Sequence, residues 1–314
     1  MPEPHCRICL QPLGGELHYH ANCCRALFGG TNIPVLPFRW DDLNSMAESV
    51  VRSQIAIPGV QPKLSLHLEH GGSKEGERFT LVGLEGGYIL KPPVTSYPEM
   101  PEVEHLTMRM ARAIGIETAE CGLMALEDEK LALIVRRMDR IGTAKLQMED
   151  FAQLSDRLTS EKYRGSLESA GKVILRYSSN PGFDALRFFE VNLFCFLTGN
   201  ADMHLKNFSL LRKADGEIGL SPAYDLLATR LLLPQDREET ALTLNGKKSN
   251  LRPKDFKILG NALQLTDRQM ENTLKRLRSR LDQATSLIDQ SFCSSGLRES
   301  YHALIRERCA KLEW

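Results

Sequence analysis

The sequence has no surplus of charge of either sign, no apolar run long enough to cross a membrane and no long low-complexity tract. Lysine and arginine together number 40, as do aspartate and glutamate, so the formal net charge is zero. A zero balance provides no global attraction to nucleic acid or to an anionic membrane. No apolar stretch approaches the ~20 residues that span a bilayer. The chain does not open on a basic segment followed by an apolar one, so we expect a cytoplasmic protein.

The cysteines are too unevenly placed for a disulfide scaffold. Four of the eight lie within the first 24 residues, and the other four are scattered. An oxidised secreted scaffold would distribute them more evenly. The remaining composition, 42% hydrophobic and 25% charged over 314 residues, is typical of a globular protein. A chain of this length forms one large domain or two lobes.

The periodicities predict an α+β protein whose N-terminal half is rich in strands. Residues 63–68 alternate leucine with polar residues, which is typical of a strand with one buried face. A helix is predicted over 102–114 from the spacing of its apolar residues. Shorter apolar runs predict further strands at 79–82 and 88–90 and a hairpin formed by 123–126 and 131–135.

The C-terminal half is predicted to be helical. Residues 183–197 are apolar nearly all round, which indicates a buried helix. The polar stretch 231–253 predicts a mobile loop. We expect three parts: a Cys/His-rich segment over 1–30, a strand-rich N-lobe over 31–146 and a helical C-lobe over 147–314.

The most informative stretch follows the predicted buried helix. It contains Asp202 and, five positions later, Asn207. Phosphoryl transfer to a hydroxyl needs a carboxylate that accepts or orients the hydroxyl proton and an amide oxygen in the shell of a hard cation such as Mg²⁺. Asp225, after a short apolar strand, offers a second metal-binding carboxylate. A capped helix start with solvated side chains is the alternative interpretation of this spacing.

Residues upstream favour the phosphoryl-transfer interpretation. Lys91 ends an apolar strand, where a kinase places the lysine that holds ATP phosphates, and Glu104 lies 13 residues later on the amphipathic helix. A lysine at a strand end can instead reach into water. Gly59, in the turn before the first strand, lets a backbone approach phosphates closely.

Taken in order, these motifs resemble the HipA-like serine/threonine kinases, which are toxins of bacterial toxin–antitoxin modules. The resemblance covers about residues 50–300. The matching segments are Gly59-Val-Gln-Pro-Lys63, Ile89-Leu-Lys91, the helix with Glu104, Val135-Arg-Arg-Met-Asp-Arg140, Gln147-Met-Glu-Asp150, Asn200-Ala-Asp-Met-His-Leu-Lys-Asn207 and Tyr224-Asp225.

The resemblance implies a two-lobed protein-kinase-like fold that binds ATP between the lobes together with Mg²⁺. It implies that Asp202 is the catalytic base and that Asn207 and Asp225 hold Mg²⁺. The further candidate catalytic residues are Lys91, His204 and Lys206. The remaining candidates for nucleotide binding are Ile57, Gly59, Val60, Gln61, Lys63 and Glu104, with the backbone of Arg136 to Met138 at the adenine.

The chain most resembles the short HipT form of the family, whose missing N-terminal subdomain is a separate protein, HipS, encoded beside a DNA-binding HipB. This resemblance implies HipS-like and HipB-like partners. The zero net charge predicts no direct DNA binding by this chain, which a HipB-like partner would provide, and the lack of a long apolar run predicts no contact with a membrane. It also implies that the substrate is an aminoacyl-tRNA synthetase, with the tryptophanyl enzyme favoured. The alternatives are a kinase-like scaffold in an antitoxin complex and a small-molecule kinase.

One position departs from the family pattern. Where the family usually has an autophosphorylated serine, this chain has Ala56. Either the phosphorylation site is absent, or Ser53 or Ser65 takes its role, or the serine was replaced.

Two chelating pairs precede the kinase-like region, Cys6-x-x-Cys9 and His20-x-x-Cys23. Four nitrogen and sulfur ligands satisfy tetrahedral Zn²⁺, and such a site is structural because it leaves no open position. A segment this short cannot build its own core, so a metal would supply its folding energy. The alternative is an arm that packs on the kinase with its thiols reduced. Cys24 is an alternative ligand to Cys23.

Overall fold

The computed structural model divides the chain into two compact units. It describes residues 4–43, 45, 62–69, 76–83, 85–142 and 144–314. The first unit is drawn from Met1–Arg109, Ala119–Arg137 and Gln290–Cys293. The second comprises Met110–Thr118, Met138–Asp289 and Ser294–Trp314. Each unit is described by itself.

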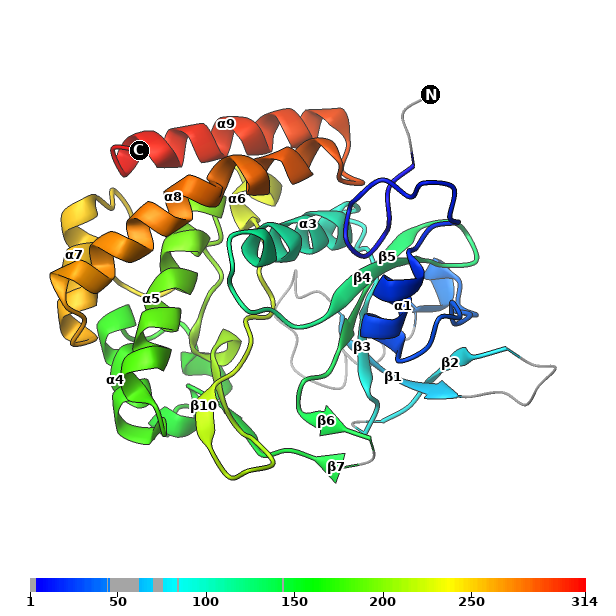
Figure 1. Cartoon of the computed structure of the whole chain (residues 1–314), viewed down its shortest axis with the longest axis horizontal. Coiled ribbons are helices and arrows are strands. Elements are labelled where there is room, and N and C mark those ends of the chain that lie inside the picture. Colours follow the sequence, from blue (N-terminus) through cyan, green and yellow to red (C-terminus); the bar gives the residue numbers. More distant parts are fainter. Residues whose placement is uncertain (1–3, 44, 46–61, 70–75, 84, 143) are drawn as a thin grey trace. The chain divides into compact units, whose positions relative to one another are not determined.

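A five-stranded antiparallel sheet forms the centre of the first unit (Figure 1). Its strand order is β2-β1-β3-β5-β4, and the predicted strands are confirmed to within two residues at each end. The bounds are β1 Leu64–Glu69, β2 Arg78–Leu81, β3 Tyr88–Lys91, β4 Cys121–Ala125 and β5 Leu131–Arg136.

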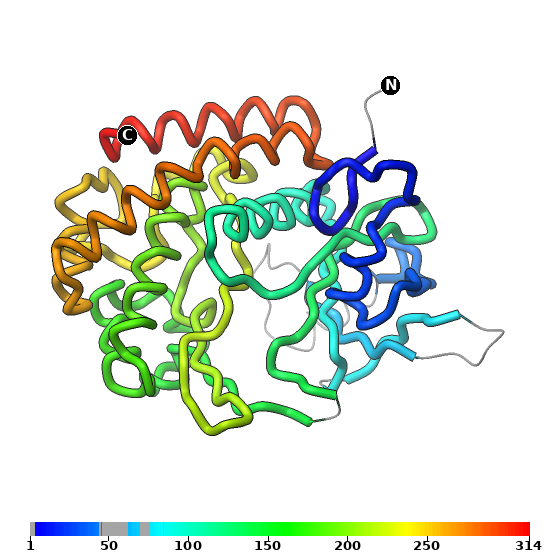
Figure 2. The backbone as a smooth tube through the Cα atoms, viewed as in Figure 1, coloured from blue at the N-terminus to red at the C-terminus, as the bar shows by residue number. Residues whose placement is uncertain are grey.

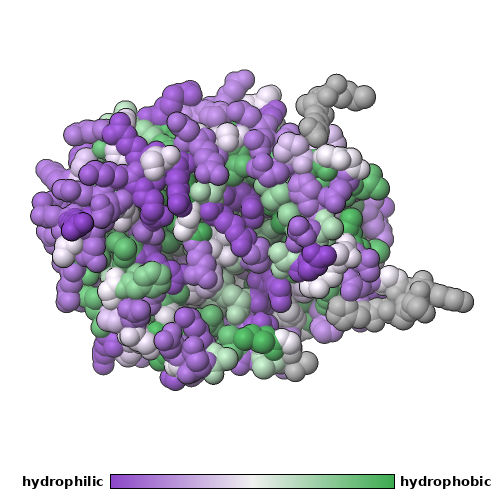
Figure 3. Space-filling model, viewed as in Figure 1, coloured by the Kyte–Doolittle hydropathy of each residue, from purple (hydrophilic) through white to green (hydrophobic). Residues whose placement is uncertain are grey.

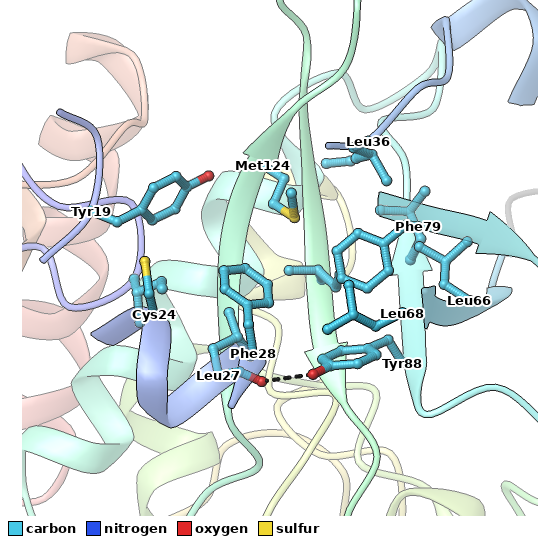
Figure 4. Packing of buried hydrophobic residues seen from close by; sticks show 14 of the residues in the cluster. Tyr19, Cys24, Leu27, Phe28, Leu36, Leu66, Leu68, Phe79, Tyr88 and Met124 are labelled. Atoms are coloured by element: carbon cyan, nitrogen blue, oxygen red, sulfur yellow. Dashed lines mark hydrogen bonds between the residues drawn. The ribbon is translucent and has the colours of Figure 1, made fainter. Parts of the chain in front are cut away.

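One face of this sheet packs against helix α1, Ala21–Phe28. Phe28 meets the rings of Phe79 and Tyr88 at centroid distances of 6.1 and 6.4 Å, and the Tyr88 hydroxyl donates to the carbonyl of Leu27 at 3.1 Å (Figure 4). The leucines of β1 turn inward to the same cluster, as their alternation predicts. The Cys/His-rich segment is therefore part of the core of this unit.

The opposite face of the sheet receives helix α3, Met100–Ala113, which lies within two residues of the predicted helix. Side chains alternate along a strand, so Tyr88 and Leu90 of β3 face α1 while Lys91 points to the other side. There Lys91 meets Glu104 of α3.

Residues near the N-terminus also cover both edges of the sheet. The Leu123 amide of edge strand β4 donates to the carbonyl of Arg7 at 2.8 Å, although the two residues lie more than a hundred positions apart (Figure 2). At the other edge, the amide of Phe79 in β2 donates to the carbonyl of Val35 at 2.9 Å. The unpaired hydrogen-bonding groups of an edge strand are thus partly satisfied on each side.

The second unit is built around helix α5, Pro181–Thr198, which confirms the predicted buried helix. Four of its five aromatic residues are buried, whereas Phe183 near its start is exposed, and Phe188 lies 4.8 Å from Phe208 by ring centroids. The other helices are α4 Leu167–Tyr177, α6 Thr229–Leu232, α7 Pro253–Ala262, α8 Asp267–Asp289 and α9 Ser295–Lys311. The short elements are β6 Arg140–Ile141, β7 Ala144–Lys145, β8 Met148–Asp150, β9 Ser209–Arg212, β10 Ile218–Leu220 and the 3-10 turns η1 Gln153–Ser155, η2 Thr159–Glu161 and η3 Leu205–Asn207.

The stretch 231–253 differs from the mobile loop that its polar composition predicts. Residues 239–242 are buried, as are Leu244 and Leu251. Glu239 accepts hydrogen bonds from the Leu251 amide at 2.8 Å and from Lys311 of α9 at 2.6 Å. The polar side chains bind one another and helix α9, so this connection is packed.

Helices that could cross a membrane are not found among the described residues. The long helix α8 carries mostly charged and polar residues on its exposed side, and Figure 3 shows a largely hydrophilic surface over it.

Candidate active site

A buried ion pair joins strand β3 to helix α3 in the first unit. Lys91 Nζ donates to Glu104 Oε1, and the two side chains are 3% and 2% exposed. The alternative in which Lys91 reaches into water is therefore wrong. The predicted pairing is present, and the role of Lys91 in phosphate binding stays a prediction.

Most of the predicted glycine-containing turn lies outside the described residues. This holds for Ile57, Gly59, Val60 and Gln61, and also for Ser53 and Ala56. Lys63 is described, and it is exposed directly before β1.

Ser65 in β1 is half-buried and has a structural partner. Its Oγ accepts the amide of Gly86 at 3.1 Å. A Cβ at Gly86 would lie 2.4 Å from the carbonyl oxygen of Leu66, so this close approach requires glycine.

The segment predicted to meet adenine begins at the end of β5. The amide of Arg136 donates to the Glu120 carbonyl at 2.8 Å, and that of Arg137 donates to the Gly87 carbonyl at 2.9 Å. These two amides are used in hydrogen bonds to other backbone carbonyls, and the contact of this segment with adenine stays a prediction. Met138, the last residue of the prediction, is half-buried in the second unit.

The candidate catalytic loop starts where α5 ends. Gly199 closes the helix with a φ of 68°, and a Cβ there would lie 2.7 Å from a methyl group of Leu304. The next residue, Asn200, is buried, and its Oδ1 accepts the amide of Asp202 at 3.0 Å. Glycine and asparagine thus fix the direction in which the loop leaves the helix.

Asp202 and Asn207 are held together by the 3-10 turn η3. Asn207 Nδ2 donates to the Asp202 carbonyl at 2.9 Å, which leaves the amide oxygen as the atom that can meet a cation. Asn207 is buried and Asp202 is half-buried. The alternative of a capped helix start with solvated side chains does not fit a buried Asn207.

Tyr163 is a partner of Asp202 that the sequence did not indicate. Its hydroxyl donates to Asp202 Oδ1 at 2.6 Å. Burial raises the pKa of Tyr163, and the hydrogen bond to Asp202 raises it further, so the phenol stays protonated and donates. The two residues lie 39 positions apart and no motif connects them.

His204, a predicted catalytic residue, packs against the ring of Tyr163 at a centroid distance of 5.0 Å. Burial lowers the pKa of His204 to about 4, although the negative charge of Asp202 opposes this shift. The imidazole is therefore neutral at pH 7.

Lys206 points away from Asp202 toward β8. Its Nζ donates to Asp150 Oδ2 at 2.8 Å, while its carbonyl accepts the Tyr224 hydroxyl at 3.0 Å. The Tyr224 oxygen lies 2.6 Å from the Ser209 hydroxyl, which must then be the donor of that bond. These bonds connect the candidate catalytic loop to Tyr224, the residue that precedes Asp225.

Asp225 adopts a φ of 55°, which is uncommon for a residue other than glycine. Such local strain is often concentrated at functional sites. The oxygen atoms of Asn207 and Asp225 are the hard ligands that Mg²⁺ prefers, so the donor set fits the predicted metal.

The four predicted zinc ligands converge in the first unit. One sulfur or nitrogen atom from each of Cys6, Cys9, His20 and Cys23 lies within 4.8 Å of every other. Cys24, the alternative to Cys23, is buried on α1 and is not among these four converging residues (Figure 4).

Two sequence comparisons connect the chain to kinases. A Haemophilus influenzae protein named "Putative kinase" is 30% identical over 240 residues, which cover 71% of this chain and 68% of that protein. The Shewanella oneidensis protein named "Serine/threonine-protein kinase toxin HipA" is 26% identical over 199 residues. That alignment covers 56% of this chain and 44% of the relative, so the chain spans less than half of that protein's length.

Two solved structures share the fold. One is the Shewanella oneidensis toxin–antitoxin complex of HipA, HipB and operator DNA, matched at a TM-score of 0.70 and 21% identity over 88% of this chain and 71% of that one. The other is the Helicobacter pylori proinflammatory kinase CtkA, at a TM-score of 0.55 and 19% identity over 74% of this chain and 90% of that one. The predicted α+β, kinase-like fold is confirmed.

The family comparison covers both units. The model of the HipA-like C-terminal domain matches residues 55–285, which include every predicted residue of the active site. This chain belongs to the HipA-like C-terminal domain family.

Proposed function

We propose that this chain is an ATP-dependent serine/threonine protein kinase. The observation that carries the proposal is the catalytic loop, in which Asn207 binds the backbone of Asp202 while the Asp202 carboxylate accepts a hydroxyl. A carboxylate that already accepts a phenolic hydroxyl at 2.6 Å has the geometry to accept the hydroxyl of a substrate.

In the proposed reaction the substrate hydroxyl oxygen forms a bond to the γ-phosphorus of ATP. The bond between that phosphorus and the oxygen bridging to the β-phosphate breaks, and ADP leaves. The hydroxyl proton passes to the Asp202 carboxylate. Lys91, held by Glu104, is the proposed phosphate-binding cation.

Mg²⁺ bound by Asn207 and Asp225 would neutralise charge on the phosphates. The chain's contribution is to fix these two oxygen ligands. Asn207 is fixed through Asp202, and Asp225 follows Tyr224, whose hydroxyl binds Lys206 and Ser209.

In the cell, the proposed role is that of a toxin in a bacterial toxin–antitoxin module. Two observations support it: the similarity to a HipA toxin and the structural match to a complex that contains HipB. The proposed partners are a HipB-like DNA-binding antitoxin and a HipS-like small protein. The proposed substrate is an aminoacyl-tRNA synthetase, with the tryptophanyl enzyme as the first to test, and the proposed location is the cytoplasm.

The test is transfer of labelled γ-phosphate to proteins of a host lysate, with labelled proteins identified by mass spectrometry. Asp202→Asn should lower transfer at least about 100-fold, since a positioned acid–base group typically supplies that much. Asp282→Asn, on the exposed side of α8, is the matched control and should retain full activity.

Three results would contradict the proposal. Retention of more than about a tenth of the activity in Asp202→Asn would remove Asp202 from the role of base. Labelling of small metabolites only would favour the small-molecule kinase. Nucleotide binding without any transfer would favour a scaffold.

A further inference from the structure

The Cys/His cluster has the spacing of a metal site. Cys9 Sγ lies 3.3 Å and Cys23 Sγ 3.9 Å from His20 Nδ1, and the four ligand atoms lie within 4.8 Å of one another. In tetrahedral Zn²⁺ sites, bonds of about 2.3 Å to sulfur and 2.1 Å to nitrogen separate neighbouring ligand atoms by roughly 3.5–3.8 Å. Small adjustments of the side chains are enough to reach that spacing.

The histidine is already in the tautomer that a metal requires. His20 Nε2 lies 2.9 Å from the carbonyl oxygen of Pro12. A carbonyl can only accept, so Nε2 carries the hydrogen and Nδ1 presents its lone pair toward the sulfur atoms. Metal-binding histidines almost always donate their other ring N–H in this way.

The turn that carries the first two cysteines is bound to helix α3. Ile8, between Cys6 and Cys9, accepts a hydrogen bond at 2.9 Å from Nε2 of His105, which is 1% exposed. His105 directly follows Glu104, the partner of Lys91. The residue of α3 that binds the turn is therefore the immediate neighbour of the residue that forms the ion pair.

The same turn is also bound to the sheet. The Leu123 amide donates to the Arg7 carbonyl of the turn at 2.8 Å. Tyr19, which directly precedes the ligand His20, donates its hydroxyl to the Leu123 carbonyl at 2.8 Å. A Cβ at Gly122 of β4 would lie 2.6 Å from Cγ1 of Ile8, so the turn fits only against glycine.

We propose that Cys6, Cys9, His20 and Cys23 bind one structural Zn²⁺ ion and that this ion fixes the position of helix α3 through Ile8 and His105. Four protein ligands close the site, so the ion does not take part in chemistry. The ion makes the turn rigid, the turn holds α3 against β4, and α3 presents Glu104 to Lys91. The zinc site stands independently of the kinase activity, whereas its effect on nucleotide binding rests on the proposed function.

The first experiment measures metal content by plasma emission spectroscopy on the full chain, purified without chelator. We expect about one zinc per chain. Cys9→Ser should lower zinc to below about 0.1 per chain, and Cys24→Ser, at the neighbouring buried cysteine outside the cluster, should retain it. A wild-type protein that holds no zinc and takes up none from one added equivalent would overturn the site, as would iron at full occupancy or a disulfide among these cysteines.

The second experiment measures amide exchange in α3 over residues 103–109, which begin at the Val103 amide that donates to the Glu99 carbonyl. Removing zinc should speed this exchange at least about tenfold, which corresponds to ~1.4 kcal/mol of local stability. Gly122→Ala keeps all four zinc ligands, so it tests the link to α3 even if the cysteine variants do not fold. It should retain zinc yet speed exchange in α3, because the added methyl group displaces Ile8. Unchanged exchange in both the zinc-free protein and Gly122→Ala would overturn the link to α3.

The third experiment measures Mg²⁺·ATP affinity by calorimetry. Zinc-depleted protein should bind the nucleotide more weakly, and one equivalent of Zn²⁺ should restore binding. If neither form binds ATP while zinc and amide exchange behave as expected, the proposed kinase function fails and the zinc site stands. If both forms bind ATP equally, the effect on the nucleotide is refuted.

Discussion

Breaking the ion pair between Lys91 and Glu104 should cost the first unit a large part of its stability. Both side chains are almost fully buried, and removing one partner of such a pair typically costs about 3–5 kcal/mol because a charge is left in a poorly solvated site. Lys91→Met and Glu104→Gln should each show this loss. The free energy of unfolding typically falls by about 2 kcal/mol per molar urea, so this loss of stability lowers the unfolding midpoint by roughly 1.5–2.5 M urea.

The double variant separates stability from function. Replacing a buried pair with apolar residues of similar volume is often neutral, so Lys91→Met/Glu104→Leu should unfold near the wild-type midpoint. It should nevertheless fail to bind Mg²⁺·ATP, because the proposed phosphate-binding cation is gone. A nearly normal unfolding midpoint together with the loss of Mg²⁺·ATP binding would show that the ion pair is needed for nucleotide binding and not for stability.

Trp40 is a suitable reporter for these titrations. Its indole N–H donates at 2.8 Å to the carbonyl of Pro93, two residues after Lys91. Trp314 belongs to the second unit and should be replaced by phenylalanine in all proteins compared. Arg78→Met is the matched control, since it breaks a solvent-exposed pair with Glu69, in which the side chains are 62% and 43% exposed, and it should shift the unfolding midpoint little. Single variants whose midpoints shift no more than the control would refute the reasoning, as would a double variant as unstable as either single one.

Three further predictions concern the second unit. Tyr163→Phe should lower kcat about tenfold without changing thermal stability, because Asp202 loses the hydroxyl that orients its carboxylate. If steady-state kinetics show a gain in kcat, the phenol blocks Asp202 instead. Asp225→Asn should weaken binding of Mg²⁺·ATP and leave binding of metal-free ATP unchanged in calorimetry, and equal losses for both would argue against a metal ligand. Burial alone would raise the pKa of Glu239, but Lys311, the Leu251 amide and Arg308 together hold the pKa below the ordinary value of 4.5. The stability of the protein should therefore fall as the pH drops below about 4.5. In Glu239→Gln the fall should be less steep when melting temperatures are compared between pH 7 and pH 3.5.

The elements that could be predicted from the sequence are those whose pattern is local. The leucine alternation of β1 and the all-round apolar character of α5 each follow from side-chain periodicity within one element. Lys91 and Glu104 could be paired because one ends a strand and the other lies on the next helix.

The partners that were missed depend on tertiary contacts. Nothing near Tyr163 or Asp202 indicates that a phenol meets the carboxylate, because the loop that carries Tyr163 is placed by the fold. The stretch 231–253 was interpreted as mobile because its residues are polar. Its charged residues include Glu239, which is buried and pairs with Arg308 and Lys311 of the distant helix α9.

The pairing of Arg7 and Val35 with the two edge strands has a consequence for how the protein can be shortened. A chain that began at residue 55, where the family match starts, would lose both of these backbone partners and all of α1. Strands β2 and β4 would then present unpaired amide and carbonyl groups beside uncovered apolar side chains, a combination that promotes strand-to-strand aggregation. Expression of residues 55–314 should therefore yield insoluble protein, because the first 40 residues keep the kinase-like fold soluble.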